Sequence, residues 1–221
     1  MLVVWSMKGS PHYREMVSSQ NFAYISDIGA SDWGKPIFIT GSAFTVSIFG
    51  IALGIELWLR HKGLLIRARC PWAGTFSALA TLFTAAGSIG LMALTVFDAK
   101  SYIGVHKACL GVFIIGTLGG ASFMCIEKWR TFREYPENRL LRRSYRLKLG
   151  FVLAEICLVT VLGTTAYLTF PNVSVVVEWI IALSFSAYMA SFTIDFLAVP
   201  KEEDVELKAC RINDEKEVQE C

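Results

Sequence analysis

Five long apolar stretches dominate the pattern of hydrophobic and polar positions along the chain. Each can cross about 30 Å of hydrocarbon as a helix, which takes roughly 20 residues. None shows a polar face recurring at helical period, which argues against an amphipathic bundle in water. The stretches cover about residues 36–59, 72–97, 102–126, 149–170 and 177–199.

This pattern predicts an all-α protein, a polytopic transmembrane helix bundle with five spans. The spans must be helices, because an isolated strand would leave unpaired backbone groups in lipid. Residues 1–35 are expected to form a polar segment outside the cytoplasm, and residues 36–199 the bundle. Residues 200–221 are expected to be a disordered cytoplasmic tail, since they carry eight Asp or Glu residues and few large apolar ones.

Composition agrees with a membrane bundle. Of the 221 residues, 54% are hydrophobic, which is more than a soluble domain of this length needs. No signal peptide is visible, because the first apolar residues are too few for one. We therefore expect either that the first span inserts with its N-terminus leading or that a helix upstream of it is missing.

The basic residues set the expected orientation. The stretch Glu127–Lys148 is predicted to be a cytoplasmic loop, and the segments on its side of the bundle carry sixteen basic residues against five on the other side. This asymmetry places the N-terminus outside and the C-terminus in the cytoplasm. The loop contains eight basic residues: Lys128, Arg130, Arg133, Arg139, Arg142, Arg143, Arg146 and Lys148.

Charges inside the spans are the next informative feature, because each one costs free energy in hydrocarbon. Glu56, Glu155 and Asp195 are expected in the cytoplasmic third of the bilayer. Glu56 can pair with Arg60 one helical turn later. The three acids can join the spans through polar contacts, which we favour, or line a polar cavity.

A second polar group is expected at the outer end of the bundle. Asp98 ends the second span, His106 lies a turn into the third, and Glu178 opens the fifth. A lipid headgroup can dock there, although solvated interface residues would give the same pattern. Asp27 lies in a segment rich in turn formers before the first span.

The sequence offers little for catalysis. No hydrolase, phosphate-loop or zinc-protease motif is present, and the six cysteines show no metal spacing. We expect no cofactor, no metal and no nucleic-acid partner, and we favour a protein that is not an enzyme. The pairs Gly50/Gly54 and Gly116/Gly120 favour close helix packing, within the bundle or between copies of the chain.

Five segments, in order, resemble the FRAG/DRAM/SFK family of multi-pass membrane proteins, in particular its fungal branch. They are YISDIGA, ELWLRHKG, GVHKACLGVF, EKWRTFREYPENRLLRRSYRLKLGFVLAE and PNVSVVVEWIIALSFSAYMASFTIDF, and the resemblance runs from about Phe22 to Val199. The family usually has six spans, so the resemblance implies that its first helix is absent here. The matching positions are Ser26, Asp27, Gly29, Arg60, His61, His106, Glu155, Glu178 and Asp195.

The resemblance implies three kinds of role. SFK-type proteins act at the plasma membrane in phosphoinositide-kinase organisation and lipid asymmetry. DRAM-type proteins modulate autophagy from lysosomal membranes, and a Golgi and ER branch takes part in GPI-anchor lipid remodelling. No catalytic residues carry over from the family.

Two hypotheses follow. In the first, the protein is a non-enzymatic regulator at the plasma membrane, whose basic loop binds anionic lipids such as phosphoinositides, or a peripheral lipid-kinase complex. The alternative reading of the loop is that its charges only set topology. In the second hypothesis, the protein modifies or transports lipids, in the plasma membrane or an endomembrane. It would use His106 with Asp98 or Glu178, or Glu155 with Asp195, if either set converges around a lipid-sized cavity.

Overall fold

The computed structural model describes residues 1–13, 16–62, 73–134 and 139–197, and these residues form helices joined by turns and short loops. Five helices are long and apolar enough to cross a membrane, which confirms the predicted all-α polytopic bundle. They are α3 (Gly34–His61), α4 (Ala73–Val96), α5 (Ile103–Glu134), α6 (Arg139–Tyr167) and α7 (Pro171–Leu197), preceded by the short helices α1 (Leu2–Met7) and α2 (Ile25–Gly29).

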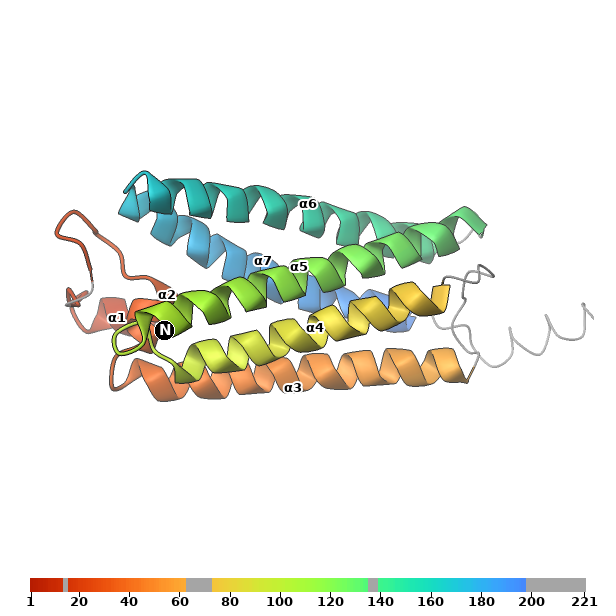
Figure 1. Cartoon of the computed structure of the whole chain (residues 1–221), viewed down its shortest axis with the longest axis horizontal. Helices are drawn as coiled ribbons and strands as arrows, with labels where there is room; N and C mark the ends of the chain where they lie inside the picture. The colour runs from red at the N-terminus through yellow and green to blue at the C-terminus, as the bar shows by residue number, and fades with distance from the viewer. Residues whose placement is uncertain (14–15, 63–72, 135–138, 198–221) are drawn as a thin grey trace, which may run out of the picture.

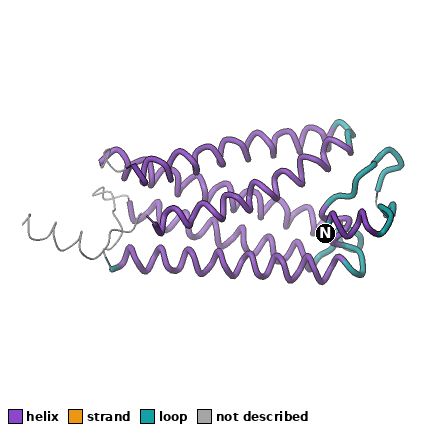
Figure 2. The backbone as a smooth tube through the Cα atoms, turned by 180° about the vertical axis from the view of Figure 1, so that it is seen from behind, coloured by secondary structure: helices purple, strands orange, loops and turns teal. Residues whose placement is uncertain are grey.

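The five long helices lie side by side and alternate in direction (Figures 1 and 2). Helix α5 packs along α4 and also contacts α6, while α6 packs along α7 and α3 lies against α4. The end that holds α1 and α2 is called the cap end below. The opposite end, where α5 finishes and α6 begins, is called the basic end.

The basic stretch 127–148 differs from its prediction as a loop. Helix α5 continues to Glu134 and α6 already begins at Arg139, so most of the stretch is helical. Arg, Leu, Lys and Glu are good helix formers, and the charged residues among them can extend a helix beyond the hydrocarbon. Helix α5 ends at Glu134, shortly before Pro136 in the sequence.

The fifth span also begins earlier than predicted. Pro171 is the first residue of α7, a position where its missing N–H costs nothing. The turn from α6 is tight, with Thr169 at φ 59° and the N–H of Phe170 donating to the Thr165 carbonyl at 2.9 Å. Asn172 therefore lies in the first turn of α7. The predicted disordered tail, residues 200–221, lies outside the described residues.

Glycines bring α4 and α5 into backbone contact. A Cβ atom added at Gly87 would lie 2.9 Å from the Thr117 nitrogen, and one added at Gly90 would lie 2.7 Å from the Phe113 nitrogen. An added Cβ at Gly116 would meet the backbone of Gly87. The predicted small-residue contact of α5 is therefore made within the bundle. At Gly50 and Gly54 on α3, by contrast, an added Cβ would meet nothing within 4 Å.

We predict that Gly116→Ala destabilises the bundle by about 1–3 kcal/mol, because the added methyl forces two backbones apart. Gly111→Ala on the same helix is the matched control, since an added Cβ there meets nothing within 4 Å. Thermal unfolding of the purified proteins in one detergent measures both. Equal melting temperatures for the two variants would show that the α4–α5 contact is not tight.

Candidate functional site

The N-terminal segment is tied to α7 at the cap end. The Glu178 carboxylate accepts the backbone N–H of Ile25 at 2.9 Å, and the Trp179 indole donates to the Ala23 carbonyl at 3.2 Å. Glu178 thus satisfies a free donor at the start of α2. Its role in the structure is to hold the segment on the bundle.

Asp27 organises the same segment from within. Its Oδ2 accepts the backbone N–H of Tyr24 at 3.1 Å and the side-chain amide of Gln20 at 3.2 Å. The carboxylate is buried and closes a capping box at the start of α2. Asp27 and Glu178 therefore both fix the path of the segment over the bundle.

Asn172 makes a two-point contact with the same segment. Its Oδ1 accepts the backbone N–H of Asn21 at 2.7 Å, and its Nδ2 donates to the Ser19 carbonyl at 2.9 Å. The amide thereby binds the N-terminal segment on both of its polar atoms.

Asp98 holds the turn between α4 and α5. Its Oδ2 lies 2.7 Å from Nζ of Lys35 at the start of α3, and its Oδ1 accepts the Ser101 backbone N–H at 2.7 Å. The hydrogen bond from Lys35 lowers the pKa of Asp98 to about 2, with the bond from Ser101 adding to the effect. This contact joins three helices at the cap end.

His106 is buried and its Nδ1 lies 2.8 Å from the Phe97 carbonyl, across the same turn. Asp98, His106 and Glu178 thus make separate contacts with Lys35, Phe97 and Ile25. These contacts do not gather the three residues into one catalytic group at the cap end. Among the described residues, no three His, Cys, Asp or Glu side chains are placed to hold a metal ion.

Protonation of Asp98 should weaken the cap end. Because its pKa in the folded protein lies below the ordinary value of 3.8, the ion pair stabilises the fold above about pH 4. This stability, about 1–2 kcal/mol after screening at the partly exposed Lys35, is lost as the pH falls from about 4 to about 2. Melting temperatures across that range should converge for the wild type and Asp98→Asn; parallel curves would rule out the contribution.

Buried charges also lie at the basic end. Oε1 of Glu56 on α3 lies 3.4 Å from Nζ of Lys128 on α5, and both side chains are almost fully buried. The predicted partner Arg60 has a side chain that the structure does not describe, so that pairing stays a prediction. Lys148 is completely buried, with its ammonium 3.6 Å from the ring centre of Phe192 and 5.3 Å from that of Tyr188.

The eight basic residues of the predicted loop therefore divide into three groups by their burial. Lys128 and Lys148 face the interior and hold the helices together, which corrects their assignment to a lipid-binding surface. Arg130 is partly buried, with its guanidinium 4.5 Å from the Phe76 ring centre. The exposed group, called the arginine surface below, consists of Arg133, Arg139, Arg142, Arg143 and Arg146.

Aromatic contacts order the arginine surface. Arg142 lies over Phe132 at 5.4 Å, and Phe132 stacks with Tyr145 across the α5–α6 junction at 6.0 Å between ring centres. Arg133 lies over Trp129 at 5.1 Å. These contacts limit the freedom of two guanidinium groups before any ligand arrives.

We predict that Lys128→Met destabilises the protein by about 3–5 kcal/mol, because removing one partner leaves the charge of Glu56 in the interior. Adding Glu56→Gln to this variant should recover part of the loss. Arg143→Gln, which removes an exposed charge from the same end, serves as the control and should leave the melting temperature unchanged. A Lys128→Met protein as stable as Arg143→Gln would contradict the buried pair.

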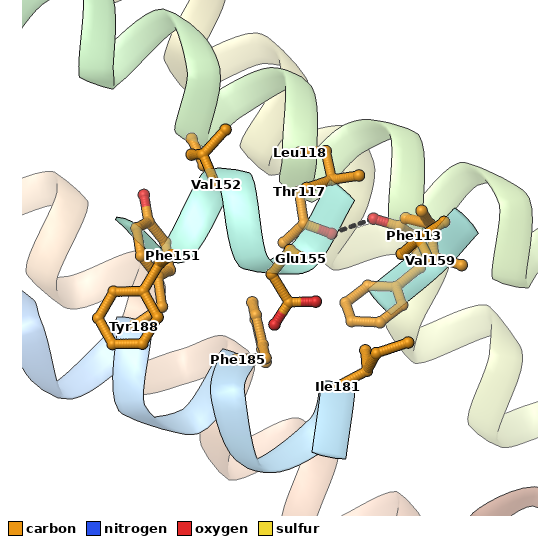
Figure 3. Close-up of a pocket in the computed structure, with 12 residues that line it drawn as sticks. Phe113, Thr117, Leu118, Phe151, Val152, Glu155, Val159, Ile181, Phe185 and Tyr188 are labelled. Atoms are coloured by element: carbon orange, nitrogen blue, oxygen red, sulfur yellow. Dashed lines mark hydrogen bonds between the residues drawn. The ribbon is translucent and has the colours of Figure 1, made fainter. Parts of the chain in front are cut away.

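Glu155 lines a cavity between α5, α6 and α7. Its carboxylate points among Phe113, Ile181 and Phe185 (Figure 3). The candidate membrane span of α6 runs from Arg142 to Tyr167. The position of Glu155 in the inner third of the bilayer stays a prediction. The side chain of Asp195, its predicted companion, is not described.

Part of this arrangement escaped the reading of the sequence. Burial of Lys128 and Lys148 was missed, as was the aromatic lining around Glu155. A signal was present, because Lys148 and Glu155 are seven residues apart and so share one face of α6. If the basic stretch is taken as helical, this spacing predicts that both side chains face the interior of the bundle.

Five membrane-length helices with a polar cap at one end and exposed arginines at the other define an integral multi-pass membrane protein. Residues 1–199 match the family model described as the Frag1/DRAM/Sfk1/Cwh43P N-terminal domain, so the chain belongs to this family. This confirms the resemblance found in the sequence.

The chain is similar to Protein sfk1 of Schizosaccharomyces pombe, with 24% identity over 199 residues. The match covers 88% of this chain and 58% of the relative, so the chain spans less than two thirds of that protein's length. No solved structure matches the chain.

Proposed function

We propose that this protein is a non-enzymatic regulator of lipid organisation that binds anionic lipids, phosphoinositides among them, through the arginine surface. The bound lipids, or the surface itself, recruit a peripheral lipid-kinase complex. Similarity to an SFK-type protein supports the plasma membrane as its location. The surplus of basic residues supports a cytoplasmic position for the arginine surface.

The division of the basic residues carries this proposal. Setting topology requires only that positive charges lie beyond the membrane, whether they are lysines or arginines. Here the two lysines are buried, and the exposed positions are five arginines on the adjoining ends of α5 and α6. A guanidinium group binds two phosphate oxygens at once, which suits Arg to headgroup recognition.

The proposal is tested with the triple variant Arg142→Gln, Arg143→Gln and Arg146→Gln in lipid nanodiscs. Each arginine near an anionic surface contributes about 1 kcal/mol, or about fivefold in affinity. Binding of a soluble short-chain phosphoinositide should therefore weaken by up to about 100-fold, and the salt dependence of the remainder should become shallower.

The matched control removes three exposed charges from the cap end, by Lys8→Gln, Lys100→Gln and Lys107→Gln. It changes net charge equally and should bind the phosphoinositide like the wild type. Equal weakening in both variants would mean that only net charge matters. Unchanged binding in the arginine variant would leave these residues with a topological role alone.

A lipid-transporting or lipid-modifying protein is the second candidate, because Glu155 lines a cavity within the bundle. Of the residues predicted for this role, the outer set makes separate structural contacts. A reaction at Glu155 would need a second reactive group, and the predicted one, Asp195, has no described side chain. The arginine surface therefore supports the first candidate better.

A further inference from the structure

The cavity at Glu155 is lined by one carboxylate and several aromatic rings. Phe113 from α5, Phe151 from α6, and Phe185 and Tyr188 from α7 line it (Figure 3). The empty space between these residues measures about 470 Å³ when its open mouth is included. Its apolar walls suit an alkyl chain.

The carboxylate is incompletely satisfied by the protein. Oε1 of Glu155 is buried and accepts no hydrogen bond from the described residues. The Ser184 hydroxyl of α7 is a polar neighbour of the carboxyl group as a whole. The Thr117 hydroxyl in the same wall donates to the Phe113 carbonyl of its own helix. Burying a carboxylate oxygen without a donor is costly, so the site favours a ligand that supplies one.

The walls indicate which donor fits. Aromatic rings present negative faces, which attract a cation and repel an anion. Lys148, on the same face of α6, lies over the Phe192 ring at 3.6 Å and shows that this interior accepts an ammonium group. A positive group at Glu155 would pair with the carboxylate and with the rings beside it.

We propose that this cavity binds a lipophilic primary amine, with its ammonium group on Glu155 and its single alkyl chain along Phe113 and Phe185. A fatty acid would bring a second negative charge to the carboxylate. A long-chain alcohol would donate one hydrogen bond without neutralising the charge. This inference does not depend on lipid binding at the arginine surface, which lies at the end of the bundle.

The test uses the full chain in nanodiscs with a photoactivatable long-chain primary amine. Label should map to peptides of α5, α6 or α7 that line the cavity. The unlabelled amine should displace it, whereas the alcohol and the acid of the same chain length should compete at least about tenfold less well. A carboxylate binds a charged donor more tightly than a neutral one, and it repels a second carboxylate. This arm needs no variant.

Glu155→Gln keeps the shape of the side chain and should weaken amine binding about 10–100-fold, with no change in elution from a sizing column. Asp98→Asn, which removes a carboxylate from the cap end, is the control and should bind the amine normally. The proposal is overturned if Glu155→Gln binds the amine like the wild type. It is equally overturned if the alcohol competes as well as the amine or if the label maps elsewhere.

Discussion

The backbone contact between α4 and α5 is the interaction on which the other features of this bundle depend. In lipid, apolar side chains gain little by leaving their surroundings for one another, so helices associate through close contact and polar bonds. Glycines at 87, 90 and 116 allow that approach. Helix α5 is thereby fixed, and it carries His106 near the cap end, Thr117 beside the cavity and Lys128 near the basic end.

The charges at the basic end then divide according to the faces of α5 and α6. Met124, Lys128 and Thr131 recur at intervals of four and three residues and all are buried, so they form the inner face of α5. Arg133 falls outside that face and is exposed. A count of positive charges cannot distinguish buried basic residues from exposed ones, because a buried lysine and an exposed arginine each add one charge. Helical phase separates them once the helix is known to continue.

The spans were predictable because hydrocarbon imposes length and apolarity on every segment that crosses it. The ends of the helices were less predictable, since a helix can continue through polar turns beyond the membrane. Polar partners were the hardest part. Lys35 and Asp98 are 63 positions apart, and Ile25 and Glu178 are 153 apart. Only the packing of α3, α4 and α7 decides that such residues meet.

Lys148 and Glu155 show why sequence proximity does not settle the fate of buried charges. Both face inward on α6, but seven residues of helix separate them by about 10 Å, too far for a direct ion pair. Lys148 is stabilised by the rings of Phe192 and Tyr188. Phe113, Phe185 and Tyr188 also line the cavity at Glu155, and the face of an aromatic ring stabilises a cation but not an anion. An environment that favours the lysine therefore leaves the glutamate in need of a positive partner.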